Sequence, residues 1–204
     1  MKFPFRPQRR TLVAGALCAL PLALSACTPE ASNKPLPFKG SDITGSGLGK
    51  GLDMIDGDGN ERTLADFKGK VLMIYFGYTQ CPDVCPTSMA QVALAIEALG
   101  NKADDVQVIL ISVDPDRDTP PIMKAYAHLF NPDFIGLTGS HEQLRKTAQS
   151  FKAFYSKEPG PTPEQYTMSH SSTFYLMDRD GEARALVRAD SSPEDMIHDI
   201  ELLL

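Results

Sequence analysis

The sequence predicts an α/β protein with a mixed central sheet flanked by helices, preceded by an N-terminal extension. Residues 71–78 form a continuous apolar run and residues 106–113 are mostly apolar, and both segments are predicted to be buried strands at the centre of the sheet. Each run is followed by a segment of helical periodicity, and a strand hairpin with a last helix closes the chain. Strands and helices that alternate in this way build a sheet covered by helices.

The other elements follow from local signals along the chain. Asp56-Gly57-Asp58-Gly59 predicts a turn between strands over residues 52–55 and 63–67. Helices are expected where a capping residue or a proline precedes an apolar period: from Pro86 to Gly100, from Thr119-Pro120 to about Phe130, from Ser140 through Ala153, and after Ser192-Pro193. Residues 174–177 and 183–187 predict the final hairpin, whereas the Pro-rich residues 157–167 predict an irregular segment.

The first 26 residues have the pattern of an export signal. Three arginines precede an apolar run over residues 12–24, which is too short to span a bilayer comfortably. The run ends in Leu24-Ser25-Ala26-Cys27, which resembles a bacterial lipobox, so we expect Cys27 to be lipidated and to begin the mature chain. An ordinary cleaved signal is the alternative. The arginine pair at residues 9–10 leaves both the general secretory and the twin-arginine export routes open.

The remaining chain divides into a tether and one domain. Residues 27–37 are polar and Pro-rich, whereas residues 38–204 are long enough to form a domain with its own core. Cleavage after residue 26 removes four basic residues and no acidic residue, which takes the net charge from −6 to −10. This acidity argues against nucleic acid as a partner. We expect a membrane-anchored lipoprotein of the bacterial cell envelope that faces the periplasm.

The predicted domain contains two cysteines, Cys81 and Cys85, where the first apolar strand ends and a helix begins. Open α/β sheets bind ligands at this carboxyl end of the strands. The helix N-terminus is expected to favour thiolate over thiol. The spacing of four allows the two sulfurs to close a disulfide or to hold a soft metal ion. Export makes disulfide formation easy, so the cysteine pair alone leaves both possibilities open.

A metal site needs a third ligand, and His170 is the best placed of the four histidines. It comes directly before the predicted strand that begins near residue 173, so its ring can reach the edge of the sheet where the cysteine loop lies. The other three histidines, at positions 128, 141 and 198, lie in or beside polar helical segments, and we expect surface positions for them. Met168 is expected to pack rather than to bind metal.

The acidic loop over residues 114–118 is expected to have a structural role. Asp114 ends a strand, Asp118 or Thr119 is placed to cap the next helix, and Arg117 can pair with one of the carboxylates. Part of a docking face for a partner protein is a second hypothesis for this loop.

Three ordered motifs resemble the Sco (SenC) family of copper-binding assembly proteins. They are FGYTQCPDVCPTSM at residues 76–89, DPDRDTP at residues 114–120, and Ser169-His170-Ser171 followed by YLMD at residues 175–178. The resemblance is collinear from about residue 38 to the C-terminus. It implies a thioredoxin-like fold and one copper ion per chain, Cu(I) or Cu(II), held by Cys81, Cys85 and His170. It also implies that the protein delivers copper to, or prepares, the dinuclear copper site of cytochrome c oxidase.

The same resemblance implies the partners. They are the copper-site subunit of cytochrome c oxidase and, as further candidates, a periplasmic copper donor and a thiol reductant. One position departs from the family pattern, because the residue before the histidine is usually aspartate and here is Ser169. A carboxylate there could orient the imidazole or compensate the copper charge, whereas a serine can only form hydrogen bonds.

A thiol-disulfide oxidoreductase is the alternative function, acting on cysteines of the oxidase subunit or in redox signalling through a Cys81–Cys85 disulfide. Oxidoreductases of this fold normally have two residues between the cysteines and a cis-proline that faces them. This chain has three residues between the cysteines, and Ser169-His170 stands where that proline is expected. Zinc is the competing metal, but no residue is obviously placed as a general base for zinc catalysis. A thiol peroxidase would need a threonine and an arginine that form no convincing pattern here.

Overall fold

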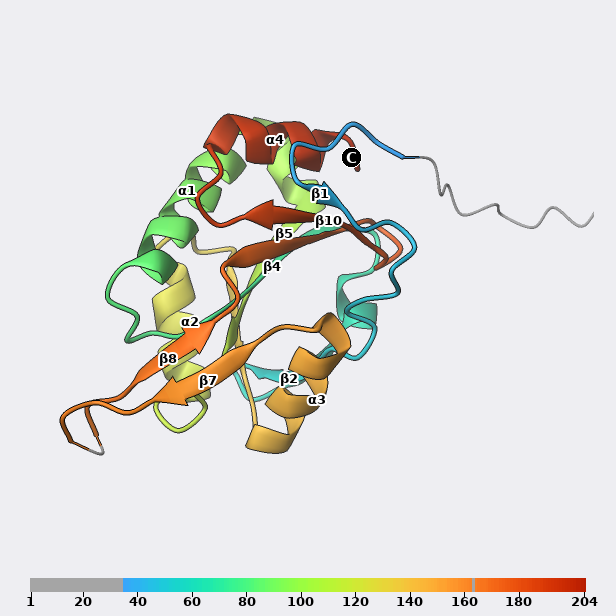
Figure 1. The fold of residues 1–204 in the computed structure, drawn as a ribbon. Coiled ribbons are helices and arrows are strands. Elements are labelled where there is room, and N and C mark those ends of the chain that lie inside the picture. The colour runs from blue at the N-terminus through green and yellow to red at the C-terminus, as the bar shows by residue number, and fades with distance from the viewer. Residues whose placement is uncertain (1–34, 163) are drawn as a thin grey trace, which may run out of the picture. The chain divides into compact units, whose positions relative to one another are not determined.

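The structure is a computed structural model that describes residues 35–162 and 164–204. The predicted export signal and the lipidation site at Cys27 lie outside these residues. The described part of the chain forms an eight-stranded mixed sheet, a separate two-stranded sheet and four α-helices (Figure 1). None of the helices in this part is long and apolar enough to cross a membrane.

The eight-stranded sheet has the order β1-β10-β9-β4-β5-β6-β2-β3. Its strands are β1 (Ser41–Asp42), β2 (Asp53–Asp56), β3 (Glu61–Thr63), β4 (Val71–Gly77), β5 (Val106–Ser112), β6 (Ile135–Thr138), β9 (Thr173–Met177) and β10 (Ala183–Arg188). The smaller sheet pairs β7 (Tyr155–Glu158) with β8 (Thr167–His170). The helices are α1 (Val84–Ala98), α2 (Pro120–His128), α3 (His141–Phe151) and α4 (Pro193–Glu201), and two 3-10 helices span Leu64–Phe67 and Gly100–Asp105.

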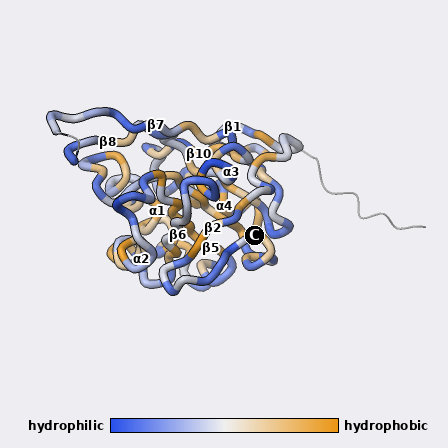
Figure 2. Tube along the Cα trace, turned by 90° about the horizontal axis from the view of Figure 1, so that it is seen from below, coloured by the Kyte–Doolittle hydropathy of each residue, from blue (hydrophilic) through white to orange (hydrophobic). Residues whose placement is uncertain are grey.

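β4 and β5 form the centre of the molecule. They pair in parallel along their whole length, every residue of both strands is buried, and β9 pairs antiparallel with the other side of β4. The predicted buried strands at the centre of the sheet are therefore confirmed. Figure 2 shows the apolar stretches of the chain gathered inside the fold and the hydrophilic stretches at its loops.

α1 and α2 cover the same face of the sheet. The chain steps in one direction from β4 to β5 to β6, and right-handed crossovers then place both connecting helices on one side. Tyr75, Leu110 and Gly136 lie side by side across these strands, and Gly136 packs closely beneath α2. α3 covers the opposite face, where Phe151 packs against Phe76 with ring centroids 5.4 Å apart. α4 packs against α1.

Most of the predicted elements are present. The turn at residues 56–59 joins β2 to β3, although the strand predicted over 63–67 is mostly a 3-10 helix. Ser140 forms the predicted capping box with Gln143 at the start of α3. Thr119 precedes α2 as predicted, but its side chain makes no capping hydrogen bond.

Besides the two-residue strand β1, three short strands were not predicted. β7 and β8 form an antiparallel hairpin that overlaps the segment expected to be irregular, and β6 extends the central sheet beside β5. Each of them has only four residues, which is too short for a clear periodic signal. The β7–β8 hairpin extends away from the main sheet at the lower left of Figure 1. Its second strand ends in His170, so the missed hairpin positions a predicted site residue.

Candidate metal centre

The cysteine loop, residues 78–83, leaves the end of β4 and turns directly into α1. Cys81 lies in this loop and is half-buried, whereas Cys85 lies in the first turn of α1 and is fully buried. Both are free thiols. The backbone N–H of Cys85 lies 3.4 Å from the sulfur of Cys81. The spacing of four residues therefore brings the sulfurs to one side of the turn, as predicted.

His170 approaches the two thiols from the β7–β8 hairpin. Its Nε2 lies 3.3 Å from the sulfur of Cys85, and the ligand atoms of Cys81, Cys85 and His170 all lie within 4.8 Å of one another. Among the described residues this is the one group of three such side chains close enough to share a metal ion. Since metal–sulfur and metal–nitrogen bonds are about 2.0–2.3 Å long, a single ion fits between the three atoms.

A backbone hydrogen bond fixes the tautomer of His170. Its Nδ1 lies 3.0 Å from the carbonyl oxygen of Ser171, which can only accept, so Nδ1 carries the proton and donates it. The unprotonated Nε2 then faces Cys85. The rings of Tyr75 and Tyr78 pack edge-on against the imidazole, with centroid distances of 5.8 and 5.9 Å. The imidazole is therefore oriented before any ligand binds.

Ser169 does not orient the imidazole. Ser169 lies opposite Ser156 and His170 lies opposite Tyr155 in the β7–β8 pairing. Because side chains alternate along a strand, the exposed side chain of Ser169 lies on the other face of the hairpin from His170. The carbonyl of Ser171 makes the orienting hydrogen bond instead. Met168 packs half-buried against the core, as expected.

Burial favours the neutral forms of the groups in the site. It raises the pKa of the Cys85 thiol far above its ordinary value and lowers the pKa of His170. The expectation that the helix N-terminus favours the thiolate does not hold for Cys85, because burial has the largest effect on its pKa and raises it. Ionisation of Cys85 requires a positive charge beside it, and a bound metal cation supplies one.

Gly77, the last residue of β4, leaves the space that the Cys85 sulfur occupies. A Cβ atom at this position would lie 3.0 Å from that sulfur and 3.1 Å from the ring edge of Tyr75. Both contacts are tighter than ordinary packing allows. The missing side chain therefore lets the thiol lie directly against the end of the central strand.

Asp118 fastens the cysteine loop to β5. Its fully buried carboxylate accepts hydrogen bonds from the backbone N–H and the hydroxyl of Thr79, at 3.2 and 2.5 Å, and from the hydroxyl of Ser112 at 2.6 Å. Burial raises the pKa of Asp118, against the opposing effect of these donors. The predicted capping role of Asp118 is wrong, because its side chain is directed to the cysteine loop and not to the start of α2.

Arg117 joins the cysteine loop to the histidine hairpin. It donates hydrogen bonds to the side chain of Gln80 at 2.9 Å and to the backbone carbonyl of Tyr166 at 3.1 Å. It also pairs with the buried carboxylate of Asp114, which confirms the predicted ion pair. The guanidinium lies 3.7 Å from the centroid of the Tyr166 ring, and the Tyr166 hydroxyl donates to Asp114 at 2.7 Å. We call Asp114, Arg117 and Tyr166 the arginine clamp.

The burial of two acidic side chains confirms the structural role of the acidic loop. Asp114 and Asp118 are both buried and face inward. Part of a docking face for a partner protein stays a hypothesis for this loop. Asp116 is exposed and contacts His141 and Lys157. The sequence analysis does not predict the roles of Tyr166 and Gln80. Both residues contact Arg117 but lie far from it along the chain, and no local sequence pattern marks such contacts.

The other three histidines lie apart from the site, as predicted. His128 is exposed at the end of α2. His141 pairs with Asp116 at 2.8 Å on the surface, and His198 contacts Asp199 at 3.0 Å in α4.

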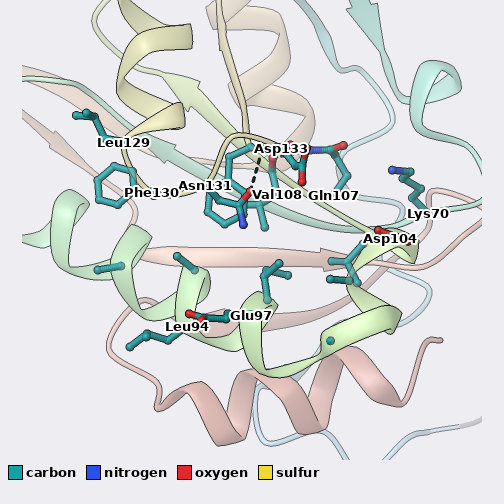
Figure 3. Close-up of a pocket in the computed structure, with 17 residues that line it drawn as sticks. Lys70, Leu94, Glu97, Asp104, Gln107, Val108, Leu129, Phe130, Asn131 and Asp133 are labelled. Carbon is teal, nitrogen blue, oxygen red and sulfur yellow. Dashed lines mark hydrogen bonds between the residues drawn. The ribbon is translucent and has the colours of Figure 1, made fainter.

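A groove of about 870 Å³, shown in Figure 3, lies beside the first residues of β5, whereas the thiols follow the last residue of β4. It is bounded by α1, by residues 129–134 after α2, and by the first residues of β5. Its lining contains neither a cysteine nor a histidine, so the groove is not part of the candidate metal centre.

Comparison with known proteins gives consistent matches. The sequence profile of the SCO1/SenC family matches residues 42–204. A SCO2-like protein of Rickettsia felis is 37% identical over 181 residues, which cover 88% of this chain and 87% of that protein. The copper-bound structure of ScoI from Bradyrhizobium japonicum is 39% identical with a TM-score of 0.71, covering 77% of this chain and 99% of that one. BsSco, described as having a disulfide switch and as a member of the Sco family of cytochrome c oxidase assembly proteins, is 26% identical with a TM-score of 0.62, covering 80% and 96%.

These similarities confirm the thioredoxin-like fold that the sequence motifs imply. The family match includes both cysteines of the loop and the histidine of the hairpin. It extends over most of the chain and over the whole central sheet except the first residue of β1. The chain therefore belongs to the SCO1/SenC family.

Proposed function

We propose that this protein binds one copper ion through Cys81, Cys85 and His170 and takes part in the assembly of cytochrome c oxidase. The observation that carries the proposal is the convergence of these three ligand atoms within 4.8 Å at the end of the central strand. The relative from B. japonicum, 39% identical, holds copper in its structure, and BsSco is described as an oxidase assembly protein. Both descriptions support the same role here.

The donor set suits copper in both oxidation states. Thiolate sulfur favours Cu(I), and imidazole nitrogen helps to hold Cu(II). Copper is the cargo in this proposal, so the site has to take it up and release it. Because the buried Cys85 is a thiol before binding, uptake releases a proton, and the affinity for copper falls as the pH falls.

The finer role that we propose is delivery of this copper to the dinuclear copper site of the oxidase. The copper-site subunit is then the partner. The lipobox-like sequence at residues 24–27 supports a lipid anchor on Cys27 and a position in the bacterial cell envelope, facing the periplasm.

Anaerobic copper titration of the reduced protein tests the copper site. The wild type is expected to bind one copper ion per chain. The Cys81→Ser/Cys85→Ser double variant is expected to lose affinity by several orders of magnitude, because soft sulfur ligands supply most of the binding. His141→Ala, which removes an exposed histidine, is the control and should bind as the wild type does. Equal affinity in the wild type and the double variant would overturn the proposal.

A thiol-disulfide oxidoreductase is the second candidate, and one observation favours it. Both thiols are free, and Cys81 is half-buried rather than fully enclosed. The Cys81 thiolate would attack a substrate disulfide, and Cys85 would then release the second substrate thiol while the Cys81–Cys85 disulfide forms. The copper-free protein should then reduce a disulfide substrate catalytically when a thiol reductant is supplied. Negligible turnover would remove this candidate.

A further inference from the structure

Tyr75 carries a buried hydroxyl that has no hydrogen-bond partner within the described part of the chain. The residue is 0% exposed, and its Oη neither donates nor accepts a hydrogen bond there. Buried polar groups are nearly always paired, so an unpaired one at a functional site calls for a physical account.

The ring of Tyr75 lies against two of the three candidate ligands. A Cβ atom on Gly77 would lie 3.0 Å from the Cys85 sulfur and 3.1 Å from Cε1 of Tyr75. Cε1 is the ring carbon next to the one that bears the hydroxyl. The sulfur and the hydroxyl end of the ring therefore border the same small space. The imidazole of His170 packs edge-on against the same ring at 5.8 Å. Tyr75 therefore projects from β4 toward the candidate metal centre.

The groups around the Tyr75 hydroxyl limit the hydrogen bonds that it can make. Ser88, one turn along α1 from Cys85, donates its own proton to the carbonyl of Val84 at 2.7 Å and can therefore only accept from Tyr75. The Tyr75 hydroxyl keeps its proton near neutral pH, because the ordinary pKa of a tyrosine is about 10, and it therefore acts as a donor. A neutral thiol accepts weakly. A thiolate is charged and accepts more strongly than Ser88 does.

We propose that Tyr75 is a positioning residue of the copper site, whose hydroxyl donates a hydrogen bond to the Cys85 sulfur once that sulfur is a copper-bound thiolate. The inference rests on the proposed copper binding. A hydrogen bond at the sulfur neutralises part of the thiolate charge, which favours Cu(I) over Cu(II). It also lowers the energy of the sulfur lone pairs and moves the sulfur-to-Cu(II) charge-transfer band to shorter wavelength.

Tyr75→Phe tests the proposal, because it removes only the hydroxyl and keeps the ring against His170. The charge-transfer band of the Cu(II) form should move to longer wavelength. The ratio of Cu(I) affinity to Cu(II) affinity, measured by chelator competition, should fall about tenfold, the effect of one charge-assisted hydrogen bond. The thermal midpoint of the copper-free variant should equal or exceed that of the wild type, since an unpaired buried hydroxyl has been removed.

Tyr175→Phe is the matched control. Tyr175 is 4% exposed and lies on the opposite face of the sheet, where it packs against Phe76 and Phe151. This variant should keep the wild-type band and affinity ratio. Incorporation of 3-fluorotyrosine at position 75 gives the opposite test, because the more acidic hydroxyl is a stronger donor and should move the band to shorter wavelength.

The outcomes separate the two proposals. A wild type that binds no copper overturns the proposed function and this inference with it. A wild type that binds copper, with an unchanged band and affinity ratio in Tyr75→Phe, overturns the inference alone, and so does an equal shift in Tyr175→Phe. If Tyr75→Phe does not fold, the protein with 3-fluorotyrosine at position 75 provides the test. An unchanged charge-transfer band in that protein overturns the inference.

Discussion

The cysteine loop and the histidine hairpin supply ligands to one site but are held in different ways. The loop leaves β4, a fully buried strand with hydrogen-bonded neighbours on both sides. The hairpin forms a two-stranded sheet of its own, and its strands contain no fully buried residue. The position of the thiols therefore depends on the global stability of the fold, whereas the position of the imidazole depends on a few local contacts.

Those local contacts are few enough to name. The arginine clamp holds Tyr166, just before β8. Ser171, just after His170, forms hydrogen bonds to both backbone groups of Phe154, at 3.0 and 2.9 Å. A change that displaces the cysteine loop is therefore expected to affect the positions of all three ligands. A change that displaces the hairpin is expected to affect mainly the position of the nitrogen ligand.

Asp118→Ala attacks the cysteine-loop side and should have the largest effect. Three buried or partly buried donors from Thr79 and Ser112 lose their acceptor, so the free energy of unfolding should fall by about 3 kcal/mol. Affinities for Cu(I) and Cu(II) should fall together, because the thiols themselves move. Denaturant unfolding and copper titration measure the two effects. Asp116→Ala, in the same loop but exposed, should change the unfolding free energy by less than about 0.5 kcal/mol.

His170→Ala removes the hairpin's ligand and should separate the two oxidation states. Affinity for Cu(II) should fall roughly 100-fold, whereas affinity for Cu(I), which two thiolates can hold, should change much less. Competition with chelators specific for each oxidation state measures both affinities. His128→Ala removes an exposed histidine and should leave both affinities unchanged. Equal losses for Cu(I) and Cu(II) would mean that the hairpin ligand has no special role in holding Cu(II).

Arg117→Ala loosens the hairpin without removing a ligand. Loss of the bonds to Gln80 and Tyr166 should lower the Cu(II) affinity about tenfold and accelerate hydrogen exchange in residues 155–170. Arg117→Lys keeps the charge but not the planar, forked geometry, and should fall between the wild type and Arg117→Ala. Arg188→Ala breaks an exposed ion pair with Asp190 and serves as the control. Unchanged exchange in the hairpin would contradict the clamp.

The smallest expected effect is a pH dependence from His170. Because burial lowers its pKa in the folded protein, the unfolded chain binds more protons once the pH falls below the ordinary imidazole pKa of about 6.5. The copper-free protein should therefore lose stability as the pH falls from 6.5 toward the lowered pKa of the folded state. His170→Gln should have a shallower slope there than the wild type, and His128→Gln should not. Urea unfolding at stepped pH values measures the slopes.

The comparison of loop and hairpin also explains what could be predicted from the sequence. β4, β5 and α1 are marked by local patterns, so the cysteine loop and its place at the end of the sheet were predicted from residues close together in the chain. The hairpin carries no such pattern, because four-residue strands flank a Pro-rich connection. His170 was identified by its place before the next strand and by the family motif, without the strand that carries it.

Contacts between distant residues could not be predicted. Arg117 and Tyr166 are 49 positions apart, and Asp118 and Thr79 are 39 positions apart. The raised pKa of Cys85 depends on burial beneath α1, which the helix-dipole argument from the sequence did not include. The unpaired hydroxyl of Tyr75 is likewise a property of packing, since in the sequence this tyrosine is one more large residue in a buried strand.

The separate hydrogen-bond ladder of the hairpin has a consequence for protein engineering. Its backbone pairs run from Tyr155–His170 to Glu158–Thr167 and involve no strand of the main sheet. The hairpin can therefore be exchanged for another as a cassette without opening an edge of that sheet, provided that Tyr166 and Ser171 are retained. A carboxylate or a thioether grafted at position 170 would then change the preference for hard or soft metals while the two sulfurs stay in place.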